Sequence, residues 1–447
     1  MRPIIVGGGI AGLAAAHEFS RAGVRALLID DKPAPGGVIR TDIVEGCVLE
    51  AGPDSFLAAK PSALELIREV RLASEVIPSN DKQRRTYIVR RGRLVPMPDG
   101  LMMVVPTRVL PVAVSPLLSL STKIRMGLEY FRRSRPQPMP DRTVGDFIRD
   151  HYGQETVDYL AEPLLAGVYG GIADQLSVVS VLPRFAEMEA KYGSLTRGVL
   201  SARRGERGPL FQTLKGGLQQ LVDALAPEAD FVSARVETLE RGWRVRAGEE
   251  WIETTRLVLA VPAWSAGALL RGVDPMLADL LETIPYSSSL TMAIGFRKSD
   301  CGPIPKGHGI LVPRPEGGTM LACTFVQAKF DHRVPEDKVV FRCFLGGAAN
   351  ERVLERADDD LLDAVLRELH GLLGWRAEPL FTRITRWRRA MAQYTVGHTE
   401  RVKQIRARVE SLPGLALAGN AYDGIGIPDC IRLGREAARR LVVRAKQ

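Results

Sequence analysis

Three glycines near the start of the chain could hold a phosphate group. Gly7, Gly9 and Gly12 stand at the spacing G-x-G-x-x-G, directly after the short apolar run 3–6. Gly7 permits a tight turn, Gly9 leaves room for a diphosphate against the backbone, and Gly12 lets a helix pack closely on a strand. A helix that starts here offers free N–H groups and about half a positive charge to the phosphates. The spacing therefore predicts a diphosphate-binding turn.

An acidic residue completes this pattern at the end of the next predicted strand, where Asp30 follows the mostly apolar residues 24–29. A carboxylate at this place accepts hydrogen bonds from the hydroxyl groups of an adenosine ribose. With a strand before the glycines and an Ala-rich helix over 13–21, the sequence predicts a dinucleotide site rather than an ordinary Gly-rich turn. The predicted contacts in this part of the chain are Gly7, Gly8, Gly9, Ile10, Ala11, Gly12, Asp30 and Asp31.

Length and composition narrow the class of protein. The 447 residues exceed one compact core, so two or three domains are expected. The five cysteines are odd in number, widely spaced and without a C-x-x-C pair, which argues for a reducing compartment and against disulfides and metal clusters. The net charge of +9 comes with interspersed acids and no nucleic-acid motif. It fits either a solvated surface or attraction to anionic lipid and a polycarboxylate substrate.

One strongly apolar stretch, residues 101–120, bears on membranes. Prolines interrupt it, so it cannot form a single spanning helix. The next predicted helix, 123–135, is rich in basic residues. Short apolar helices with basic neighbours suit a protein that lies in one leaflet, but the same helices could line a buried pocket. Both interpretations stay open. The N-terminal apolar run leads into the glycine turn and not into a cleavage site, so no signal peptide is predicted.

Two further segments carry a family resemblance. Gly36 and Gly37 follow the acid at the distance found in the flavin amine oxidase and porphyrinogen oxidase superfamily, although Ala34 stands where that pattern has arginine. Residues 50–56 resemble the E-x-G-P-D-S-F segment of oxygen-dependent protoporphyrinogen and coproporphyrinogen oxidases. The resemblance implies FAD as the cofactor. A second G-x-G-x-x-G is absent from the sequence, so no NAD(P)H site is expected.

The same resemblance continues in order to the end of the chain. Residues 386–394 are similar to R-W-x-x-A-M-P-Q-Y, and residues 419–431 to G-N-x-Y-x-G-x-x-x-P-D-C-I, where a second helix begins and its N-terminus would favour reduced flavin. The cofactor contacts that the resemblance implies beyond the first turn are Gly36, Gly37, Gly52, Pro53, Asp54, Ser55, Val236, Ala260, Trp387, Gly419, Asn420, Ile425, Gly426 and Ile427.

Substrate contacts are implied at fewer positions. Residues 166–177 resemble the family's G-V-Y-G-G…L-S loop, and the hairpin 84–98 resembles one whose basic residue contacts a propionate. The implied substrate-binding residues are Arg85, Gly167, Tyr169, Leu311 and Phe325. No His/Asp/Ser constellation stands out as catalytic. The resemblance implies that no strong side-chain base is needed, because aromatisation of the macrocycle supplies much of the driving force. No metal ligands are predicted.

The implied fold is an α/β + α flavoprotein like p-hydroxybenzoate hydroxylase. It would combine a discontinuous Rossmann-like FAD-binding domain, a mixed-sheet substrate domain and a helical membrane-binding domain. The predicted cofactor domain comprises 1–75, 208–280 and 384–447. The predicted substrate domain comprises 76–92, 181–207 and 281–383, and the helical domain 93–180.

The implied activity is the six-electron oxidation of protoporphyrinogen IX to protoporphyrin IX in haem biosynthesis, with oxygen as acceptor. Oxidation of coproporphyrinogen III is the alternative, because the sequence does not separate the two substrates. A flavin amine oxidase and a non-catalytic porphyrin carrier are the rival interpretations. The resemblance further implies a cytoplasmic protein, peripheral on the inner face of the cell membrane, with hand-off to ferrochelatase and a homodimer as candidate associations. No nucleic-acid partner is expected.

Overall fold

The computed structural model describes residues 1–134, 140–202 and 208–444, so the predicted basic residue Arg135 lies outside the described residues. The chain divides into two compact units. Unit 1 contains Met1–Ser79, Pro209–Pro285 and Glu400–Gln447, and unit 2 contains Asn80–Gly208 and Tyr286–Thr399. Each unit is therefore assembled from segments that are far apart in the sequence.

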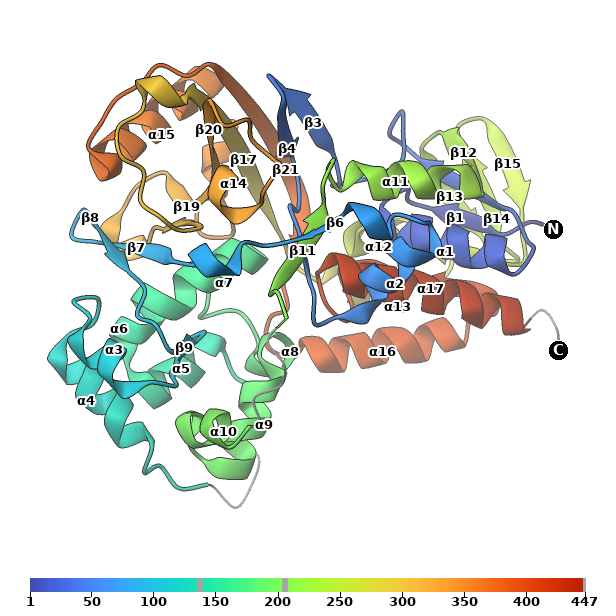
Figure 1. The fold of residues 1–447 in the computed structure, drawn as a ribbon. Helices are drawn as coiled ribbons and strands as arrows, with labels where there is room; N and C mark the ends of the chain where they lie inside the picture. The colour runs from blue at the N-terminus through green and yellow to red at the C-terminus, as the bar shows by residue number, and fades with distance from the viewer. Residues whose placement is uncertain (135–139, 203–207, 445–447) are drawn as a thin grey trace. The chain divides into compact units, whose positions relative to one another are not determined.

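Among the described residues, unit 1 contains a five-stranded parallel sheet (Figure 1). Its strands are short and apolar, and β1 at the centre is fully buried, as expected for a parallel sheet covered on both faces. The strand order is β12 (Ala229–Ser233), β2 (Ala26–Asp30), β1 (Ile4–Val6), β16 (Leu257–Leu259) and β22 (Leu415–Leu417).

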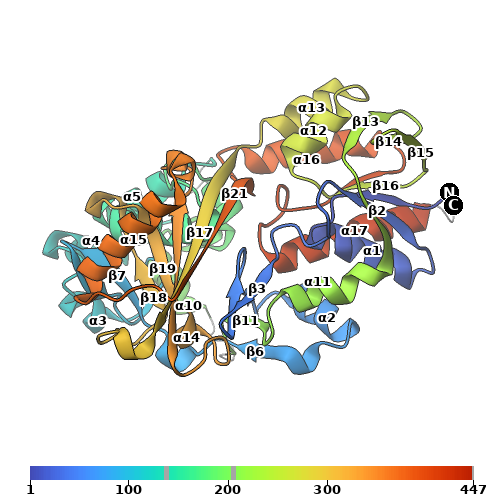
Figure 2. The ribbon, with the colours of Figure 1, turned by 90° about the horizontal axis from the view of Figure 1, so that it is seen from above.

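Two long helices pack together against this sheet. α1 (Ile10–Arg21) follows β1, and α17 (Ile427–Arg444) follows β22, and the two lie side by side (Figure 2). Gly434 allows the close approach, because a Cβ there would collide with the carbonyl oxygen of Ala11. The first and last segments of the chain therefore share one hydrophobic core.

Smaller elements complete unit 1. They are β3 (Thr41–Val44), β4 (Cys47–Glu50), β5 (Phe56–Leu57), α2 (Pro61–Glu69), β6 (Val76–Pro78), β11 (Phe211–Leu214), α11 (Gln219–Leu225), β13 (Val236–Glu240), β14 (Arg244–Ala247), β15 (Glu250–Glu253), α12 (Ala263–Leu270), α13 (Pro275–Glu282) and most of α16 (His398–Glu410). β3 and β4 form a hairpin, β5, β11 and β6 a small antiparallel sheet, and β13 to β15 a meander.

Unit 2 is built on a second sheet, which has seven strands in the part of the chain that the structure describes. Neighbouring strands are antiparallel except for the parallel pair β18–β7. The order is β21 (Phe381–Ala392), β17 (Tyr286–Arg297), β20 (Lys338–Gly346), β19 (Met320–Phe325), β18 (Gly309–Leu311), β7 (Thr86–Arg90) and β8 (Arg93–Pro96). Helix α15 (Asp358–Leu373) packs its apolar residues on one face, and α7 (Glu162–Tyr169) contacts β18 and β19.

One predicted boundary needs correction. The sequence places residues from 384 onward in the cofactor domain, whereas 384–399 belong to unit 2. The physical reason is strand pairing: β21 forms a long antiparallel ladder with β17, in which Trp387 lies opposite Ser289. This twelve-residue strand holds the segment in the second sheet. The finer division of unit 2 into a substrate domain and a helical domain stays a prediction.

Short helices make up the rest of unit 2 (Figure 1). They include α3 (Val109–Val114), α4 (Leu120–Glu129), α5 (Val144–Tyr152), α6 (Gln154–Thr156), α8 (Val178–Val181), α9 (Pro183–Tyr192), α10 (Leu195–Ser201) and α14 (Val326–Lys329), with a small β9 (Leu101–Met102) and β10 (Val105–Pro106) pair. α4 begins earlier than predicted because Ser119 caps it, accepting a hydrogen bond from the N–H of Thr122. None of the described helices is long and apolar enough to cross a membrane.

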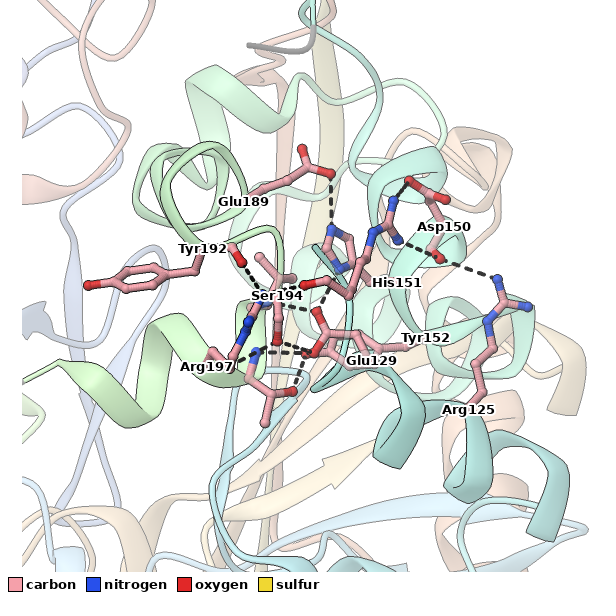
Figure 3. A network of polar contacts seen from close by, with 12 residues as sticks. Arg125, Glu129, Asp150, His151, Tyr152, Glu189, Tyr192, Ser194 and Arg197 are labelled. Atoms are coloured by element: carbon pink, nitrogen blue, oxygen red, sulfur yellow. Dashed lines mark hydrogen bonds and ion pairs between the residues drawn. The ribbon is translucent and has the colours of Figure 1, made fainter. Parts of the chain in front are cut away.

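A buried polar network ties α4, α5, α9 and α10 together (Figure 3). Glu129 of α4 accepts hydrogen bonds from Ser194 Oγ at 2.9 Å and from the N–H of Leu195 at 2.7 Å. It also accepts from the N–H of Thr196 at 3.2 Å and contacts the ring of His151 on α5, which reaches Glu189 on α9 as well. The helices of this region are thus held by charge as well as by apolar packing.

Candidate functional site

The predicted phosphate turn forms between β1 and α1. Gly7 has φ of +108°, and a Cβ there would collide with the carbonyl group of Ala260. A Cβ on Gly12 would collide with the carbonyl oxygen of Gly7. Both positions therefore require glycine, the first for its backbone conformation and for space, the second for space alone. The strand–turn–helix predicted from the glycine spacing is confirmed.

Gly9 behaves differently from its two neighbours. It caps α1 with an ordinary extended backbone, and a Cβ there would meet nothing within 4 Å. No side chain caps the helix in the described structure. Its first-turn N–H groups have no acceptor within the helix, and the space beside Gly9 is open. Donors and space of this kind fit the diphosphate of FAD.

Asp30 lies at the end of β2 next to this turn. Its Oδ2 accepts a hydrogen bond from the N–H of Gly8 at 2.5 Å, and its Oδ1 accepts one from the N–H of Lys32 at 2.9 Å. Each carboxylate oxygen has a second lone pair with which it can accept from a ribose hydroxyl. The neighbouring Asp31 is exposed and lies 3.7 Å from the ammonium group of Lys32.

The second glycine pair packs directly on the first turn. The N–H of Gly36 donates to the carbonyl of Gly8 at 2.8 Å, and a bridge joins Gly36 to Gly9. Gly37 has φ of +61°, and a Cβ on it would come within 3.0 Å of the Gly9 Cα. The two glycine segments thus form one backbone surface, which a side chain at Gly36 or Gly37 would disturb.

The segment 52–55 lies between β4 and β5. Gly52 packs so closely on the carbonyl of Val38 that a Cβ would collide with it. Pro53 and Asp54 are partly exposed, and Asp54 accepts a hydrogen bond from Ser55 Oγ at 2.7 Å. The segment is accessible and is anchored by backbone packing.

Three later segments reach the same edge of the parallel sheet. Ala260 follows β16, and its N–H donates to the carbonyl of Val6 at 2.7 Å. Gly419 follows β22 with φ of +127°, and a Cβ there would meet only the carbonyl oxygen of Val261, at 3.9 Å. Val236 opens β13, two residues after Ala234, whose N–H donates to the backbone carbonyl of Asp30. Ligands of doubly wound sheets bind at this edge, where the strands end.

Unit 1 therefore brings together the predicted cofactor residues from the glycine turns, Asp30, Ala260 and the C-terminal turn. Trp387 is the exception, because it lies on β21 in unit 2. The remaining predicted contacts Asn420, Ile425, Gly426 and Ile427 lie between β22 and the start of α17. That these side chains and amides bind FAD stays a prediction.

The predicted substrate residues separate into two groups in unit 2. Gly167 and Tyr169 lie at the end of α7, and Leu311 is half-buried on β18, which α7 contacts. Phe325 is fully buried on the α15 face of the sheet, 5.4 Å from the ring of Phe341, so the prediction that it binds substrate is corrected: it is a core residue. The sequence alone does not tell whether an aromatic side chain at the end of a strand lies in the core or lines a pocket.

Arg85 is exposed at the start of β7. Its carbonyl accepts a hydrogen bond from the N–H of His308 at 2.8 Å, which fixes the backbone beside it. Burial lowers the pKa of His308, so that imidazole stays neutral near the arginine. Because Arg85 is exposed, its guanidinium can contact a ligand at the surface of unit 2.

Two charged residues of unit 1 were not predicted. Lys60, the residue before α2, donates to Asp429 near the start of α17 at 2.8 and 2.6 Å. The sequence signals are an acid in the first turn of a helix that begins Ile427-Pro428 and a lysine directly before Pro61. Nothing in the sequence pairs them across the length of the chain.

Known proteins match this chain over nearly its full length. A family model described as flavin containing amine oxidoreductase matches residues 10–442. A coproporphyrinogen III oxidase of Bacillus subtilis is 31% identical, covering 97% of this chain and 96% of its own. A coproporphyrinogen III oxidase of Propionibacterium freudenreichii is 34% identical, covering 98% and 90%. A solved structure from Exiguobacterium sp. 255-15, assigned by name to protoporphyrinogen oxidase, has a TM-score of 0.90 at 30% identity and covers 99% of both chains.

Proposed function

Because this chain belongs to the flavin containing amine oxidoreductase family, with FAD as its cofactor, we propose that it oxidises a porphyrinogen to a porphyrin in haem biosynthesis. The observation that carries the proposal is the match to two coproporphyrinogen III oxidases over almost the whole chain. The residues predicted to bind the cofactor support it, since the glycine turns leave the space and the donors that a diphosphate needs.

The choice of substrate is the finer part of the proposal. The family resemblance implies protoporphyrinogen IX, with coproporphyrinogen III as the alternative that the sequence does not separate from it. The names of the two relatives favour coproporphyrinogen III. The name of the structural neighbour favours protoporphyrinogen. We propose coproporphyrinogen III as the first substrate to test, because both relatives, which match almost the whole chain, carry that name.

The proposed chemistry needs no side chain as a strong acid or base. FAD, when bound, supplies the acceptor for hydride from the methylene bridges, and pyrrole N–H groups release the protons. The chain's own contribution is to bind and orient the cofactor through the glycine turns and Asp30. The apolar sheet face of unit 2 near Leu311 and Tyr169 would exclude water from the macrocycle.

An anionic membrane surface is proposed as a further partner. Helices α3 and α4 expose large apolar side chains to solvent, which is unusual for a helix surface. Exposed basic residues lie on α4 or beside the two helices, including Arg108, Arg125 and Arg133. The exposed apolar residues are Val109, Leu110, Val114, Leu120, Ile124, Leu128 and Phe131. This combination fits one leaflet of a bilayer with anionic lipid.

Oxygen-coupled turnover of both porphyrinogens, measured side by side, tests the proposed function. Formation of porphyrin fluorescence with one substrate, and bleaching of the flavin absorbance on anaerobic mixing, are the expected results. Binding of the substrate without bleaching would instead indicate a carrier. Turnover of a monoamine or polyamine, with no porphyrin formed, would indicate an amine oxidase.

A further inference from the structure

An ion pair within unit 1 joins the segment 56–60 to the start of α17. The ammonium group of Lys60 donates to both carboxylate oxygens of Asp429, at 2.8 Å to Oδ1 and 2.6 Å to Oδ2. The carboxylate side chain is 11% exposed and the lysine side chain 45% exposed. The lysine thus covers a nearly buried acid from the solvent side.

Asp429 also shapes the turn before its own helix. Its Oδ2 accepts a hydrogen bond from the N–H of Gly426, the residue before α17, at 3.3 Å. This is the backward half of a capping box, in which an acid in the first turn satisfies the N–H at the cap. Gly424 has φ of +103°, and a Cβ there would collide with the Asp429 carboxylate. The turn 424–426 is therefore folded around the acid.

The negative charge of Asp429 opposes the positive N-terminus of α17, next to which the flavin is predicted to bind. The N-terminus of α17 carries about half a positive charge, which favours an electron-rich ligand. An ionised carboxylate in the first turn cancels that charge. Burial and the Asp429 charge raise the pKa of the neighbouring Cys430 to about 12, although Lys60 opposes this, so the thiol stays neutral. The nearby Arg432 pairs with Glu436 and adds no net charge.

We propose that Lys60 is a positioning residue for the bound flavin: its ammonium group cancels the charge of Asp429, so that the turn 424–426 stays electropositive and favours reduced over oxidised FAD. The inference rests on the proposed function, since it requires FAD at the predicted contacts Ile425 and Gly426. It adds a role for two residues that touch neither the diphosphate turn nor the predicted substrate side chains.

Replacement of Lys60 by methionine in the full-length holoprotein tests the inference. The Lys60→Met variant leaves Asp429 charged and uncompensated, so it should lose about tenfold in preference for reduced over oxidised flavin. For a two-electron couple this is a midpoint potential lower by about 30 mV, measured by anaerobic dye equilibration. Lys60→Arg, which keeps the charge, should stay near the parent potential.

A second replacement separates charge from structure. Lys60→Met combined with Asp429→Asn removes both charges and should return the potential towards that of the parent protein. If the lysine acted only as a structural tie, both variants would lose FAD affinity and melting temperature while the potential of bound flavin stayed unchanged, and the inference would be overturned. Parent protein that binds no FAD would instead overturn the proposed function.

Discussion

His151 Nδ1 lies 2.8 Å from Glu129 Oε1, and neither side chain has any surface exposed to solvent. The ring's other nitrogen lies 3.1 Å from Glu189 Oε1, so one imidazole sits between two carboxylates (Figure 3). Burial opposes ionisation of Glu129, but hydrogen bonds from His151, Thr196 and Leu195 outweigh it and lower its pKa to about 2. The helices α4 and α5 are joined by an ionised acid.

This network predicts how stability depends on pH. The pKa of Glu129 falls from an ordinary 4.5 to about 2 on folding, so its stabilisation is complete above pH 4.5 and is lost as the pH falls towards 2. In the parent, ionised Glu129 contributes about 3 kcal/mol to the free energy of unfolding above pH 4.5. Glu129→Gln should therefore show a smaller fall in the free energy of unfolding as the pH is lowered. Chemical denaturation between pH 2.5 and 7 measures this.

The control is Glu187→Gln, which removes an exposed carboxylate from α9. It should leave the slope of stability against pH unchanged. Parallel curves for parent and Glu129→Gln, offset by a constant amount, would show that the carboxylate does not titrate as its contacts indicate.

Local patterns were enough to predict the cofactor turn. Gly7, Gly9 and Gly12 act within one strand–turn–helix, and the backbone conformation that they permit is set by residues close in sequence. The same holds for the hairpin of β7 and β8 and for the cap of α5, where Thr143 accepts from the N–H of Asp146. Such features need no tertiary information.

Contacts between distant segments could not be predicted in this way. Phe325 lies in an apolar strand, and the sequence pattern is the same whether its ring faces the core or a pocket. Its packing on Phe341 shows that the ring lies in the core. The pair Lys60–Asp429 spans most of the chain. The family resemblance assigns Trp387 to the cofactor domain, but pairing of β21 with β17 places it in unit 2.

Gly9→Val should abolish FAD binding without unfolding the protein. A Cβ at Gly9 would meet no protein atom within 4 Å and needs no unusual backbone angle, so we expect the fold to tolerate valine. The same side chain would occupy the space in which the diphosphate is expected, and FAD affinity should fall at least about tenfold. Flavin fluorescence titration of the apoprotein measures the affinity, and circular dichroism the melting temperature.

Gly272→Val is the matched control, because a Cβ there also meets nothing within 4 Å and the residue lies in the same unit. It should bind FAD as the parent does. A Gly9→Val protein that retains the flavin would show that the diphosphate does not approach this residue.

Asp30→Asn should weaken FAD by about tenfold or more, because a charge-assisted hydrogen bond to ribose is lost. The amide oxygen can still accept from the N–H of Gly8, so the turn should keep its fold. Asp230→Asn on the neighbouring β12, which pairs with Arg25, is the control and should not change FAD affinity. Equal FAD affinities for Asp30→Asn and the parent protein would show that the Asp30 carboxylate does not contact the cofactor.

Replacement of the outward face of α4 tests the membrane proposal. Ile124 and Leu128 are 54% and 63% exposed, while Met126 on the opposite side is buried, so the helix presents apolar residues to solvent. Changing Ile124, Leu128 and Phe131 to serine should lower binding to vesicles of anionic phospholipid by at least about tenfold, since each buried apolar side chain contributes about 1.5–3 kcal/mol. Co-sedimentation measures the binding. Met276→Ser, an exposed apolar residue of unit 1, should leave it unchanged. If the parent protein does not bind such vesicles at low salt, this face of α4 does not bind an anionic membrane.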